Sequence, residues 1–282
     1  MHLDNGDTHW PRIHSISGVQ EKYSLILDKN KLRLLNEGEQ GNYILKPIPQ
    51  FGEKQDQIPA NEHLTMQIAR QIYKIETAEN ALIFFQSGKA AYLTKRFDIN
   101  SKGEKLSIED FASLAGRTPQ THGENYKYLG SYLELFELLE KYLNTYKIEA
   151  LKLFKLLLFN YLFSNGDAHF KNFSVLETVD GDYKLSPAYD LLNTRIHVAD
   201  SYFALEKGLL PTHLAIGNVR KQFYVLAEKA KLKSRILEQI FSDMLSHSDK
   251  VNTLIQASFL DEPTKRQYLQ AYQTRYKRLT KE

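Results

Sequence analysis

The chain has 282 residues, enough for one large domain or for two lobes that share a cleft, and its composition, 42% hydrophobic and 25% charged, is ordinary for a globular protein. A net charge of +3 is too small to indicate a nucleic-acid partner, and the absence of cysteine excludes disulfides and thiolate zinc sites. The N-terminus lacks a secretory h-region, and the longest apolar run, Ala150 to Phe163, contains lysines and is too short to span a bilayer. We expect a soluble, cytoplasmic protein that contacts neither membrane nor nucleic acid.

Residues 13–46 have a β-rich composition. The runs Tyr23–Leu27 and Tyr43–Lys46 are β-prone, and turn-forming residues lie between them. Residues 15–22 form a small, polar link ahead of the first run, and its backbone N–H groups could wrap phosphates. Because the link has one glycine, an ordinary hairpin loop is the simpler interpretation of this stretch taken alone.

A lysine and a glutamate follow in the order that kinases use. Lys46 ends an apolar strand, where it could reach ATP phosphates as a point charge or simply be solvated. After a polar loop at 47–59, the recurrence of apolar residues every fourth position predicts a helix over Ala60–Tyr73. Glu62 lies in its first turn, where the helix dipole already favours a carboxylate. Alternatively, Glu62 pairs with Lys46 and orients it from the neighbouring helix.

Two further strands are predicted before the character of the chain changes. They are Ala81–Phe85 and Ala90–Phe97, and the polar stretch Asp98–Gly103 follows them. We place the change of lobe at this stretch, which divides the chain into residues 1–100 and 101–282. Lys95 to Phe97 are then candidates for the backbone that presents hydrogen-bonding groups to adenine.

From Ser107 onward the pattern is mainly helical. The apolar helix ends at Asn165-Gly166, a good helix-stop pair, and two strands around residues 180–182 form a predicted hairpin after it. The predicted helices are Ile108–Ala115, Tyr126–Tyr146, Ala150–Phe163, Arg220–Lys231, Ser234–Ser246, Asp249–Ala257 and Glu262–Leu279, and the predicted hairpin strands are Phe173–Leu176 and Tyr183–Leu185.

The stretch Ser164–Asn172 carries the chemistry. Asp167 could orient an incoming hydroxyl and accept its proton, and Asn172, five residues later, offers an amide oxygen suited to magnesium. Asp190 arrives after the hairpin and supplies a charged oxygen to the same metal. Lys171 could neutralise phosphate charge and His169 could position the loop or the ligand. With Lys46 and Glu62 upstream, these residues indicate a kinase rather than a chance polar loop.

The chain resembles the HipA family of bacterial serine/threonine kinase toxins, whose fold is kinase-like. The resemblance implies an α+β, two-lobed protein-kinase-like fold with a small β-rich N-lobe and a larger, mainly helical C-lobe. The chain differs from eukaryotic protein kinases, because its glycine-containing loop lacks G-x-G-x-x-G and a histidine follows the expected catalytic aspartate rather than preceding it. The resemblance rests on Ser15–Lys22, Ile44–Lys46, Asn61-Glu62, Arg96–Asp98, Asp167–Asn172 and Pro187–Asp190.

The resemblance also implies roles for particular residues. It places the catalytic aspartate at Asp167 and the Mg²⁺ ligands at Asn172 and Asp190. Family members autophosphorylate a serine of the glycine-containing loop, and Ser15 and Ser17 are the candidates here; a phosphate would add about −1.5 to −2 charges and repel ATP. The implied ATP contacts are Ser17, Gly18, Val19, Gln20, Glu21, Lys22, Lys46, Lys95, Arg96, Phe97, His169, Lys171 and Tyr189.

Partners are implied by the same resemblance. Only fourteen residues precede Ser15, as in the short, HipT-like members in which the N-terminal subdomain is a separate antitoxin protein. A HipS-like partner and a DNA-binding HipB-like partner are therefore expected. Family members phosphorylate aminoacyl-tRNA synthetases and inhibit translation, which makes such a synthetase the expected substrate.

Two other functions compete with this one. The stretch Asn165–Asn172 is as similar to small-molecule kinases of the aminoglycoside-phosphotransferase type as to protein kinases, but the Ser15–Gly18 loop argues against that reading. A non-catalytic module that uses a kinase fold for binding is the second alternative. The joint presence of four residues argues against a pure scaffold, which does not need them: Lys46, Asp167, Asn172 and Asp190.

Overall fold

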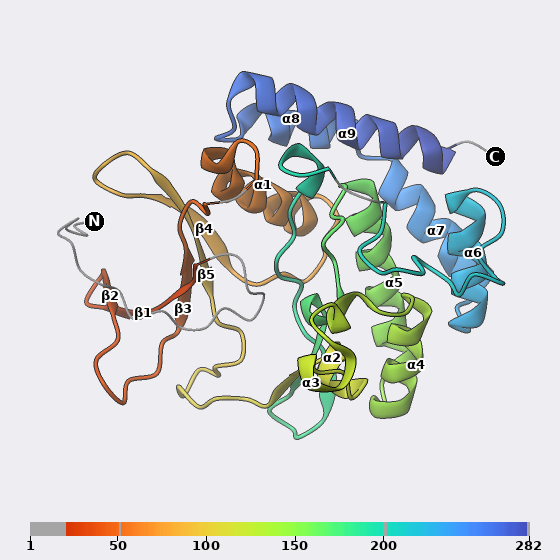
Figure 1. Cartoon of the computed structure of the whole chain (residues 1–282), viewed down its shortest axis with the longest axis horizontal. Coiled ribbons are helices and arrows are strands. Elements are labelled where there is room, and N and C mark those ends of the chain that lie inside the picture. The colour runs from red at the N-terminus through yellow and green to blue at the C-terminus, as the bar shows by residue number, and fades with distance from the viewer. Residues whose placement is uncertain (1–20, 51, 200–201, 281–282) are drawn as a thin grey trace.

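The computed structural model describes residues 21–50, 52–199 and 202–280. It has a small lobe built on a β-sheet and a larger, mainly helical lobe, which lie side by side in Figure 1. The predicted α+β, two-lobed fold is therefore confirmed. The division of the chain at residue 100 stays a prediction.

The small lobe is a five-stranded antiparallel sheet in the order β2-β1-β3-β5-β4. Successive side chains of a strand point to opposite faces of the sheet, and here both faces pack against apolar residues. Ala91 and Leu93 of β5 lie in a small cluster with Leu25, whereas Tyr92 between them belongs to the large core. The predicted strands form, and β2 adds one that was not predicted. The strands are β1 Tyr23–Asp28, β2 Lys31–Leu34, β3 Tyr43–Lys46, β4 Asn80–Phe84 and β5 Ala90–Lys95.

Helix α1, Ile58–Gln71, joins the sheet to the larger lobe. A short 3-10 turn, Gln55–Gln57, precedes it, and a proline occupies its first turn, where no backbone N–H is needed. Leu64 and Ile68 lie on its buried face, as the four-residue spacing predicted. Because these side chains belong to the same core as the C-terminal helices, α1 positions any residue that it carries relative to both lobes.

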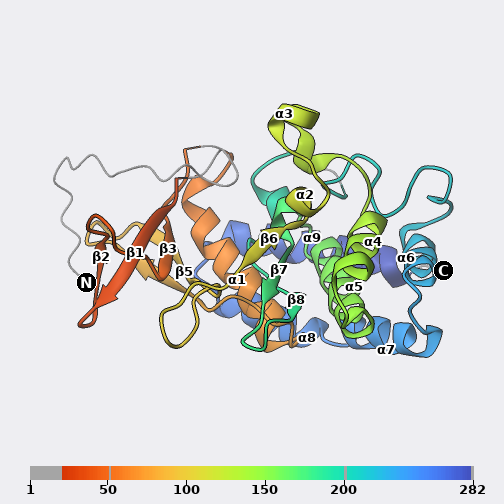
Figure 2. The same cartoon turned by 90° about the horizontal axis from the view of Figure 1, so that it is seen from below.

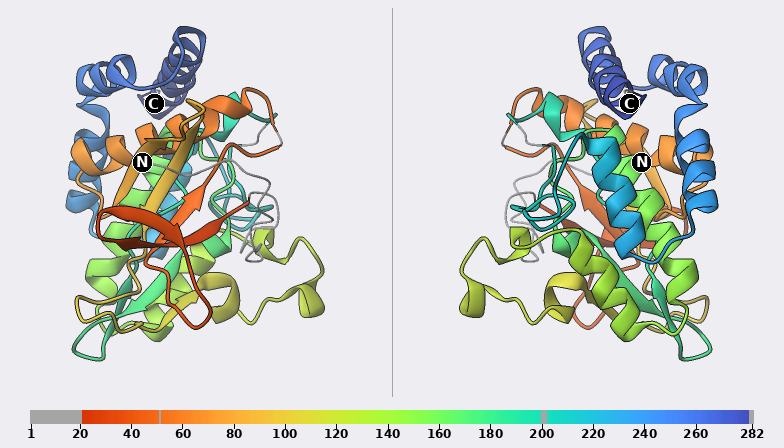
Figure 3. Two further views of the ribbon diagram at one scale, coloured as in Figure 1. Left: turned by 90° about the vertical axis from the view of Figure 1, so that its left-hand side faces the viewer. Right: turned by 90° about the vertical axis from the view of Figure 1, so that its right-hand side faces the viewer.

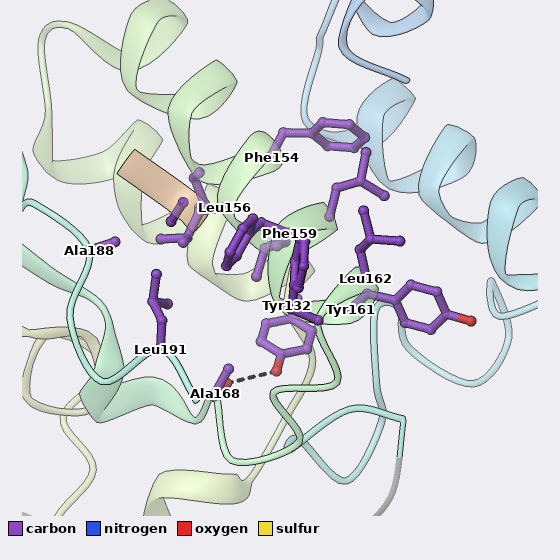
Figure 4. Close-up of a cluster of buried hydrophobic side chains, with 14 of the residues drawn as sticks. Tyr132, Phe154, Leu156, Phe159, Tyr161, Leu162, Ala168, Ala188 and Leu191 are labelled. Carbon is purple, nitrogen blue, oxygen red and sulfur yellow. Dashed lines mark hydrogen bonds between the residues drawn. The ribbon is translucent and has the colours of Figure 1, made fainter. Parts of the chain in front are cut away.

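The larger lobe surrounds α5, Tyr146–Leu162. This helix is apolar nearly all round, and Leu153, Phe154 and Leu158 are fully buried. Figure 4 shows the cluster of apolar side chains around it, together with Ala168, which follows the helix. The prediction of a central buried helix is confirmed, although α5 begins four residues before the predicted Ala150.

The first and last residues of the C-terminal helices α6 to α9 all agree with the predicted ones to within two residues. In Figures 1 and 3, α8 and α9 lie at one end of the molecule, near α1. None of the helices in the described ranges is long and apolar enough to cross a membrane. The observed bounds are α6 Val219–Lys229, α7 Ser234–Leu245, α8 Ser248–Ala257 and α9 Glu262–Thr280.

The predicted helix Ile108–Ala115 is wrong in its first half. Residues Ile108–Asp110 form strand β6, which pairs with β7, Ser174–Glu177, and only Phe111–Leu114 form a helix, α2. The Asp110 side chain accepts the backbone N–H of Ser113 and caps α2. Strand pairing with a distant segment thus overrode the local helical pattern. The predicted hairpin is present, because β7 pairs with β8, Tyr183–Leu185.

The single helix predicted over Tyr126–Tyr146 is also wrong. A 3-10 turn over Tyr126–Tyr128 is followed by irregular backbone and then by α4, Leu133–Tyr142. Gly130 breaks the helix with a φ of 89°, a conformation that favours glycine. Another short helix, α3 Pro119–His122, precedes the turn and projects from the body of the protein in Figure 2.

Candidate active site

Lys46, Glu62 and Asp190 meet where the two lobes face each other. The Lys46 Nζ atom lies 2.6 Å from Glu62 Oε1, and it also donates to Asp190 Oδ1. Lys46 comes from the end of β3, Glu62 from α1 and Asp190 from the segment after β8. Three elements far apart in the sequence therefore place one buried lysine between two carboxylates, and the alternative in which Lys46 is simply solvated is wrong, since 3% of this residue is exposed.

The charges of this cluster stabilise one another. Burial disfavours the charged Lys46 ammonium, but the carboxylates of Asp190 and Glu62 more than offset that cost and raise its pKa. Burial likewise disfavours the ionised Asp190, and the ammoniums of Lys22 and Lys46 nevertheless hold its pKa well below the usual range. Lys22 Nζ lies 3.8 Å from Asp190 Oδ2. Burial raises the pKa of Glu62, although the Lys46 ammonium opposes that rise. Lys46 and Asp190 are therefore the groups of this cluster that are charged near neutral pH.

Ser164 to Asp167 turn sharply out of the core at the end of α5. Ser164 has a φ of 55°, and its carbonyl oxygen accepts the Thr194 N–H and hydroxyl at 3.1 and 3.0 Å. Thr194 Oγ1 in turn accepts the Gly166 N–H at 2.9 Å. These bonds hold the backbone on both sides of Asn165, so that Asp167 emerges from a fixed turn.

Arg275 of α9 supports the same turn from behind. Its Nε donates to the Ser164 hydroxyl at 3.3 Å, although only 1% of the arginine is exposed. The guanidinium lies 4.8 Å from the Tyr161 ring centroid and 4.0 Å from that of Tyr202, in the geometry of cation–π contacts. Among the described residues, aromatic faces rather than a carboxylate contact this guanidinium, and its bond to Ser164 ties the last helix directly to the start of the Asp167 loop.

Asp167 is the exposed member of the site. Its Oδ1 accepts the Tyr128 hydroxyl at 2.8 Å. Five residues later, the Asn172 amide lies against Asp190, with 3.3 Å between Asn172 Nδ2 and Asp190 Oδ2, and Asn172 Oδ1 accepts the His169 N–H at 3.0 Å. The spacing of five residues therefore directs Asp167 to solvent and Asn172 into the cleft.

Asn172 and Asp190 fit a magnesium ion. Both carry oxygen ligands, and the hydrogen bond between their side chains shows that the two groups are close enough to share one cation. In the described part of the chain, no group of three or more His, Cys, Asp or Glu side chains could hold a metal. Magnesium does not require one, because it commonly uses one or two protein ligands together with phosphate oxygens and water.

A cavity of about 420 Å³ lies between these groups. Phe97 and Tyr189 form one wall, with ring centroids 5.6 Å apart, and Tyr189 is fixed by hydrogen bonds to Ser174 Oγ at 2.6 Å and to the Lys171 carbonyl at 2.9 Å. The predicted residues that line the cavity are Lys22, Lys46, Lys95, Arg96, Phe97, His169, Lys171, Asn172, Tyr189 and Asp190. An aromatic wall beside a cluster of charges suits a nucleotide, which has an apolar base and anionic phosphates.

Several predicted contacts have other partners. Lys95 pairs with Glu79 at 3.2 Å on the surface, and Lys171 pairs with Asp110 at 2.6 Å. Arg96 binds Asp98 through two nitrogens, at 2.9 and 2.5 Å. Glu21 is exposed and accepts the hydroxyl of a neighbouring tyrosine. Glu62 lies behind the cavity lining, and Asp167 lies outside it. The predicted residues Ser15, Ser17, Gly18, Val19 and Gln20 fall outside the described residues.

His169 is buried and electrically neutral. Burial, reinforced by the positive charge of Lys127, lowers its pKa to about 3. Its ring meets that of Tyr128 edge-on, with centroids 5.1 Å apart. At physiological pH it therefore shapes the loop and the cavity wall as an uncharged ring.

Asp110 and Tyr128 contact functional side chains and were not predicted. Asp110 lies in a stretch with a helical pattern, and Tyr128 lies in a segment assigned to a long regular helix. Neither stretch carries a motif, and their contacts with Lys171 and Asp167 span 61 and 39 residues. Only the path of the chain between β6 and α4 brings them to the site.

A search of protein families matches residues 14–251 to the family described as "HipA-like C-terminal domain". The chain belongs to this family. The matched range includes every residue of the site described above except Arg275 of α9. The resemblance inferred from the motifs is thereby confirmed at the level of the family.

Known relatives of this HipA-like chain carry kinase names. "Putative kinase" of Haemophilus influenzae is 25% identical over 270 residues, which cover 88% of this chain and 77% of the relative. "Putative kinase Y4dM" of Sinorhizobium fredii is 31% identical over 197 residues, covering 64% of this chain. The matched region spans 45% of that relative, less than half of its length.

Solved structures show the fold. A HipA chain from the Shewanella oneidensis toxin–antitoxin complex of HipA, HipB and operator DNA matches with a TM-score of 0.67 and 21% identity, covering 99% of this chain and 67% of that one. The Helicobacter pylori proinflammatory kinase CtkA matches with a TM-score of 0.61 and 14% identity, covering 95% of each chain. The fold is thus that of HipA-like kinases.

Proposed function

We propose that this protein is an ATP- and magnesium-dependent protein kinase that phosphorylates serine or threonine. The observation that carries the proposal is the buried Lys46, which bonds to Glu62 of α1 and to Asp190 at the cavity that Asn172 also lines. A phosphate-binding lysine held by a helix glutamate, beside two magnesium ligands, is the arrangement by which kinases hold ATP. The kinase names of the relatives support the same activity.

The residues have distinct tasks in the proposed reaction. Lys46 contacts the phosphates, while the wall formed by Phe97 and Tyr189 packs against adenine. Asn172 and Asp190 hold Mg²⁺, which neutralises phosphate charge when bound. Asp167 orients the acceptor hydroxyl and takes its proton as the new bond from oxygen to the γ-phosphorus forms. The bond between that phosphorus and the β–γ bridging oxygen breaks, and ADP leaves.

The biological role follows from the family. We propose a toxin of a toxin–antitoxin pair that acts in the cytoplasm, where an aminoacyl-tRNA synthetase is the protein substrate and its phosphorylation inhibits translation. The Shewanella HipA structure contains HipB and operator DNA, which supports a HipB-like protein as an antitoxin partner. A HipS-like partner is proposed from the family resemblance. In this role the chain itself contacts proteins, and any DNA contact belongs to the partner.

Autophosphorylation would regulate this activity. We propose Ser15 and Ser17 as the modified residues, because they lie in the predicted phosphate-binding link just ahead of Lys22. Lys22, the last residue of this predicted link, has its Nζ atom 3.8 Å from Oδ2 of Asp190, one of the proposed magnesium ligands. A phosphate of about −1.5 to −2 charges near Asp190 would repel ATP phosphates.

The alternatives have less support. A small-molecule kinase of the aminoglycoside type would need an acidic acceptor pocket beside this cavity, in whose lining basic residues outnumber acidic ones, as suits anionic phosphates. The basic residues are Lys22, Lys46, Lys95, Arg96, Lys105 and Lys171, and the acidic ones are Asp98, Asp110 and Asp190. A non-catalytic module would bind ATP with magnesium and leave it intact.

The test is transfer of labelled terminal phosphate from ATP. The purified protein should label itself or proteins of a cell extract, and Asp167→Gln should abolish labelling while ATP still binds. Phosphoproteomics of cells that express the wild type or Asp167→Gln would then identify the acceptor. Full labelling by the variant would remove Asp167 from the mechanism, and label on a metabolite would favour the small-molecule kinase.

A further inference from the structure

Two tyrosines from outside the catalytic loop bind consecutive residues of that loop. The Tyr128 hydroxyl donates to Asp167 Oδ1 at 2.8 Å, and the Tyr132 hydroxyl donates to the Ala168 carbonyl at 2.7 Å. Figure 4 shows the second bond, in which the Tyr132 ring lies in the core beside α5 and its hydroxyl points to Ala168. The segment from the 3-10 turn to the start of α4 is thus hydrogen-bonded to the catalytic loop at Asp167, the proposed base, and at the residue after it.

This segment is held firmly in place. The Glu206 N–H donates to the Tyr128 carbonyl at 3.0 Å, and Arg117 Nη1 donates to the Leu129 carbonyl at 2.7 Å. The Arg117 guanidinium also lies 4.5 Å from the ring centroid of Phe170, three residues after Asp167. Because its backbone carbonyls are engaged at Tyr128 and at Leu129, the segment can fix the direction of the Asp167 carboxylate.

Lys127 brings a positive charge to the same place. Its Nζ lies 5.0 Å from the centroid of the Tyr128 ring, in a cation–π contact. Burial lowers the pKa of its ammonium, and the nearby charges that act on it are those of Asp167, Lys171, Lys22 and Asp190. Lys127 thus lies against the ring whose hydroxyl binds Asp167, the proposed base.

Lys171 is less suited to that task, although it belongs to the catalytic loop. Its Nζ is held by Asp110 at 2.6 Å, and 14% of its side chain is exposed. Within residues 21–50, 52–199 and 202–280, no carboxylate lies within ion-pair distance of Lys127. The ammonium of Lys127 is therefore the better candidate for neutralising charge that develops on a phosphoryl group near Asp167.

We propose that Lys127 and Tyr128 complete the reaction site of the proposed kinase. Tyr128 is a positioning residue that holds the Asp167 carboxylate toward the acceptor hydroxyl, and it keeps its own proton while Asp167 takes the proton of that hydroxyl. Lys127 supplies positive charge to the phosphoryl group in transfer. The inference rests on the proposed function, and it assigns part of the chemistry to a segment that precedes the catalytic loop by about forty residues.

The test uses Tyr128→Phe, Lys127→Met and Lys127→Arg in the full chain. ATP with labelled γ-phosphate is the probe, and transfer to the chain itself and to water is measured over a range of ATP concentrations. Tyr128→Phe and Lys127→Met should lower kcat by about 10- to 100-fold with KM for ATP changed less than about 3-fold. Lys127→Arg should recover most of the loss, because it keeps the charge.

The chain offers a matched control. Lys141 Nζ lies 4.7 Å from the Tyr142 ring centroid at the end of α4, the same kind of pair on an exposed surface and outside the cavity lining. Lys141→Met and Tyr142→Phe should leave kcat unchanged. Calorimetric ATP affinity and thermal melting of each variant show whether its fold and nucleotide site are intact.

The outcomes separate the two proposals. Wild-type kcat in intact Tyr128→Phe and Lys127→Met would overturn this inference and leave the kinase function standing. A loss in Lys127→Arg as deep as in Lys127→Met would overturn the charge role of Lys127. A wild type that binds ATP but transfers no phosphate, with or without Mg²⁺, would overturn the proposed function and this inference with it.

Discussion

The two sides of the cleft present their charges in opposite ways. On the side of the small lobe, Lys46 and Glu62 are each 3% exposed and are joined by an ion pair that α1 and β3 hold in place. On the side of the large lobe, Asp167 is exposed on a loop and is oriented by Tyr128 from an irregular segment. Buried charges suit a small ligand whose phosphates are always the same, whereas an exposed aspartate can meet a hydroxyl on a large, variable protein.

The difference also concerns what holds each side. The buried side depends on the ion pairs of Lys46, because removal of one partner leaves the other charged side chain unpaired in a region of low dielectric constant. The exposed side depends on hydrogen bonds to Asp167 and on the support of the Ser164 turn by Arg275 and Thr194. Substitutions should therefore damage stability and nucleotide binding on the first side, and catalysis with little loss of stability on the second.

The largest effect should come from Lys46→Met. This change leaves the buried Glu62 carboxylate without its cation and should lower the free energy of unfolding by about 3–5 kcal/mol. ATP binding should be lost with it. Urea denaturation measures the first and calorimetry the second. Adding Glu62→Gln should restore part of the stability but no ATP binding. If the double variant instead lost as much stability as the two single variants together, Lys46 and Glu62 would not be energetically coupled.

Asp190→Asn should remove the contribution of magnesium. For the wild type, Mg²⁺ with a non-hydrolysable ATP analogue at about 100 times its Kd should stabilise the fold by about 2.7 kcal/mol. The variant should show little additional stabilisation when Mg²⁺ joins the analogue, because one of the two proposed ligands has lost its charge. Thermal melting with and without Mg²⁺ measures this. Asp182→Asn, in the exposed β7–β8 turn, is the control and should behave like the wild type.

His169 should make stability depend on pH. Its pKa is about 3 in the fold, through burial, against about 6.5 when unfolded, so the unfolded chain binds more protons as pH falls below about 6.5. Its contribution to stability is therefore complete above that pH and falls by up to about 1.4 kcal/mol per pH unit on acidification toward 3.

The comparison is with His169→Gln, which does not titrate. Unfolding free energies of both proteins between pH 7.5 and 5 should diverge in slope below about pH 6.5. Parallel curves over this range would mean that His169 binds its proton equally well in the folded protein, in conflict with its burial.

The smallest effect should come from Lys95→Ala. The Lys95–Glu79 pair is 3.2 Å long with side chains 51% and 61% exposed, and exposed pairs contribute about 0–1 kcal/mol. If adenine is bound by backbone groups at this position, the Kd for ATP should change less than about 2-fold, as calorimetry would detect. A large loss of affinity would give the Lys95 side chain a role in nucleotide binding.

Much of the fold could be predicted because its elements carry local signals. The α5 helix is apolar nearly all round and ends shortly before Asn165-Gly166, and the spacing of Leu64 and Ile68 marked α1. The two errors have different physical causes. At Ile108–Asp110, pairing with the distant strand β7 overrode a pattern that was helical over a few residues, and at Gly130 a positive φ interrupted the predicted helix.

The amino-acid sequence by itself determined which residue types this protein brings to its chemistry. Asp167, Asn172 and Asp190 follow one another at spacings that are set by a loop and a hairpin, and Lys46 and Glu62 lie on adjacent elements, so local rules suffice to link them. Only the tertiary structure decided their partners. That Asp190 shares Lys46 with Glu62, that Lys171 is held by Asp110, and that Tyr128 reaches Asp167 depend on how distant elements pack, which no local spacing encodes.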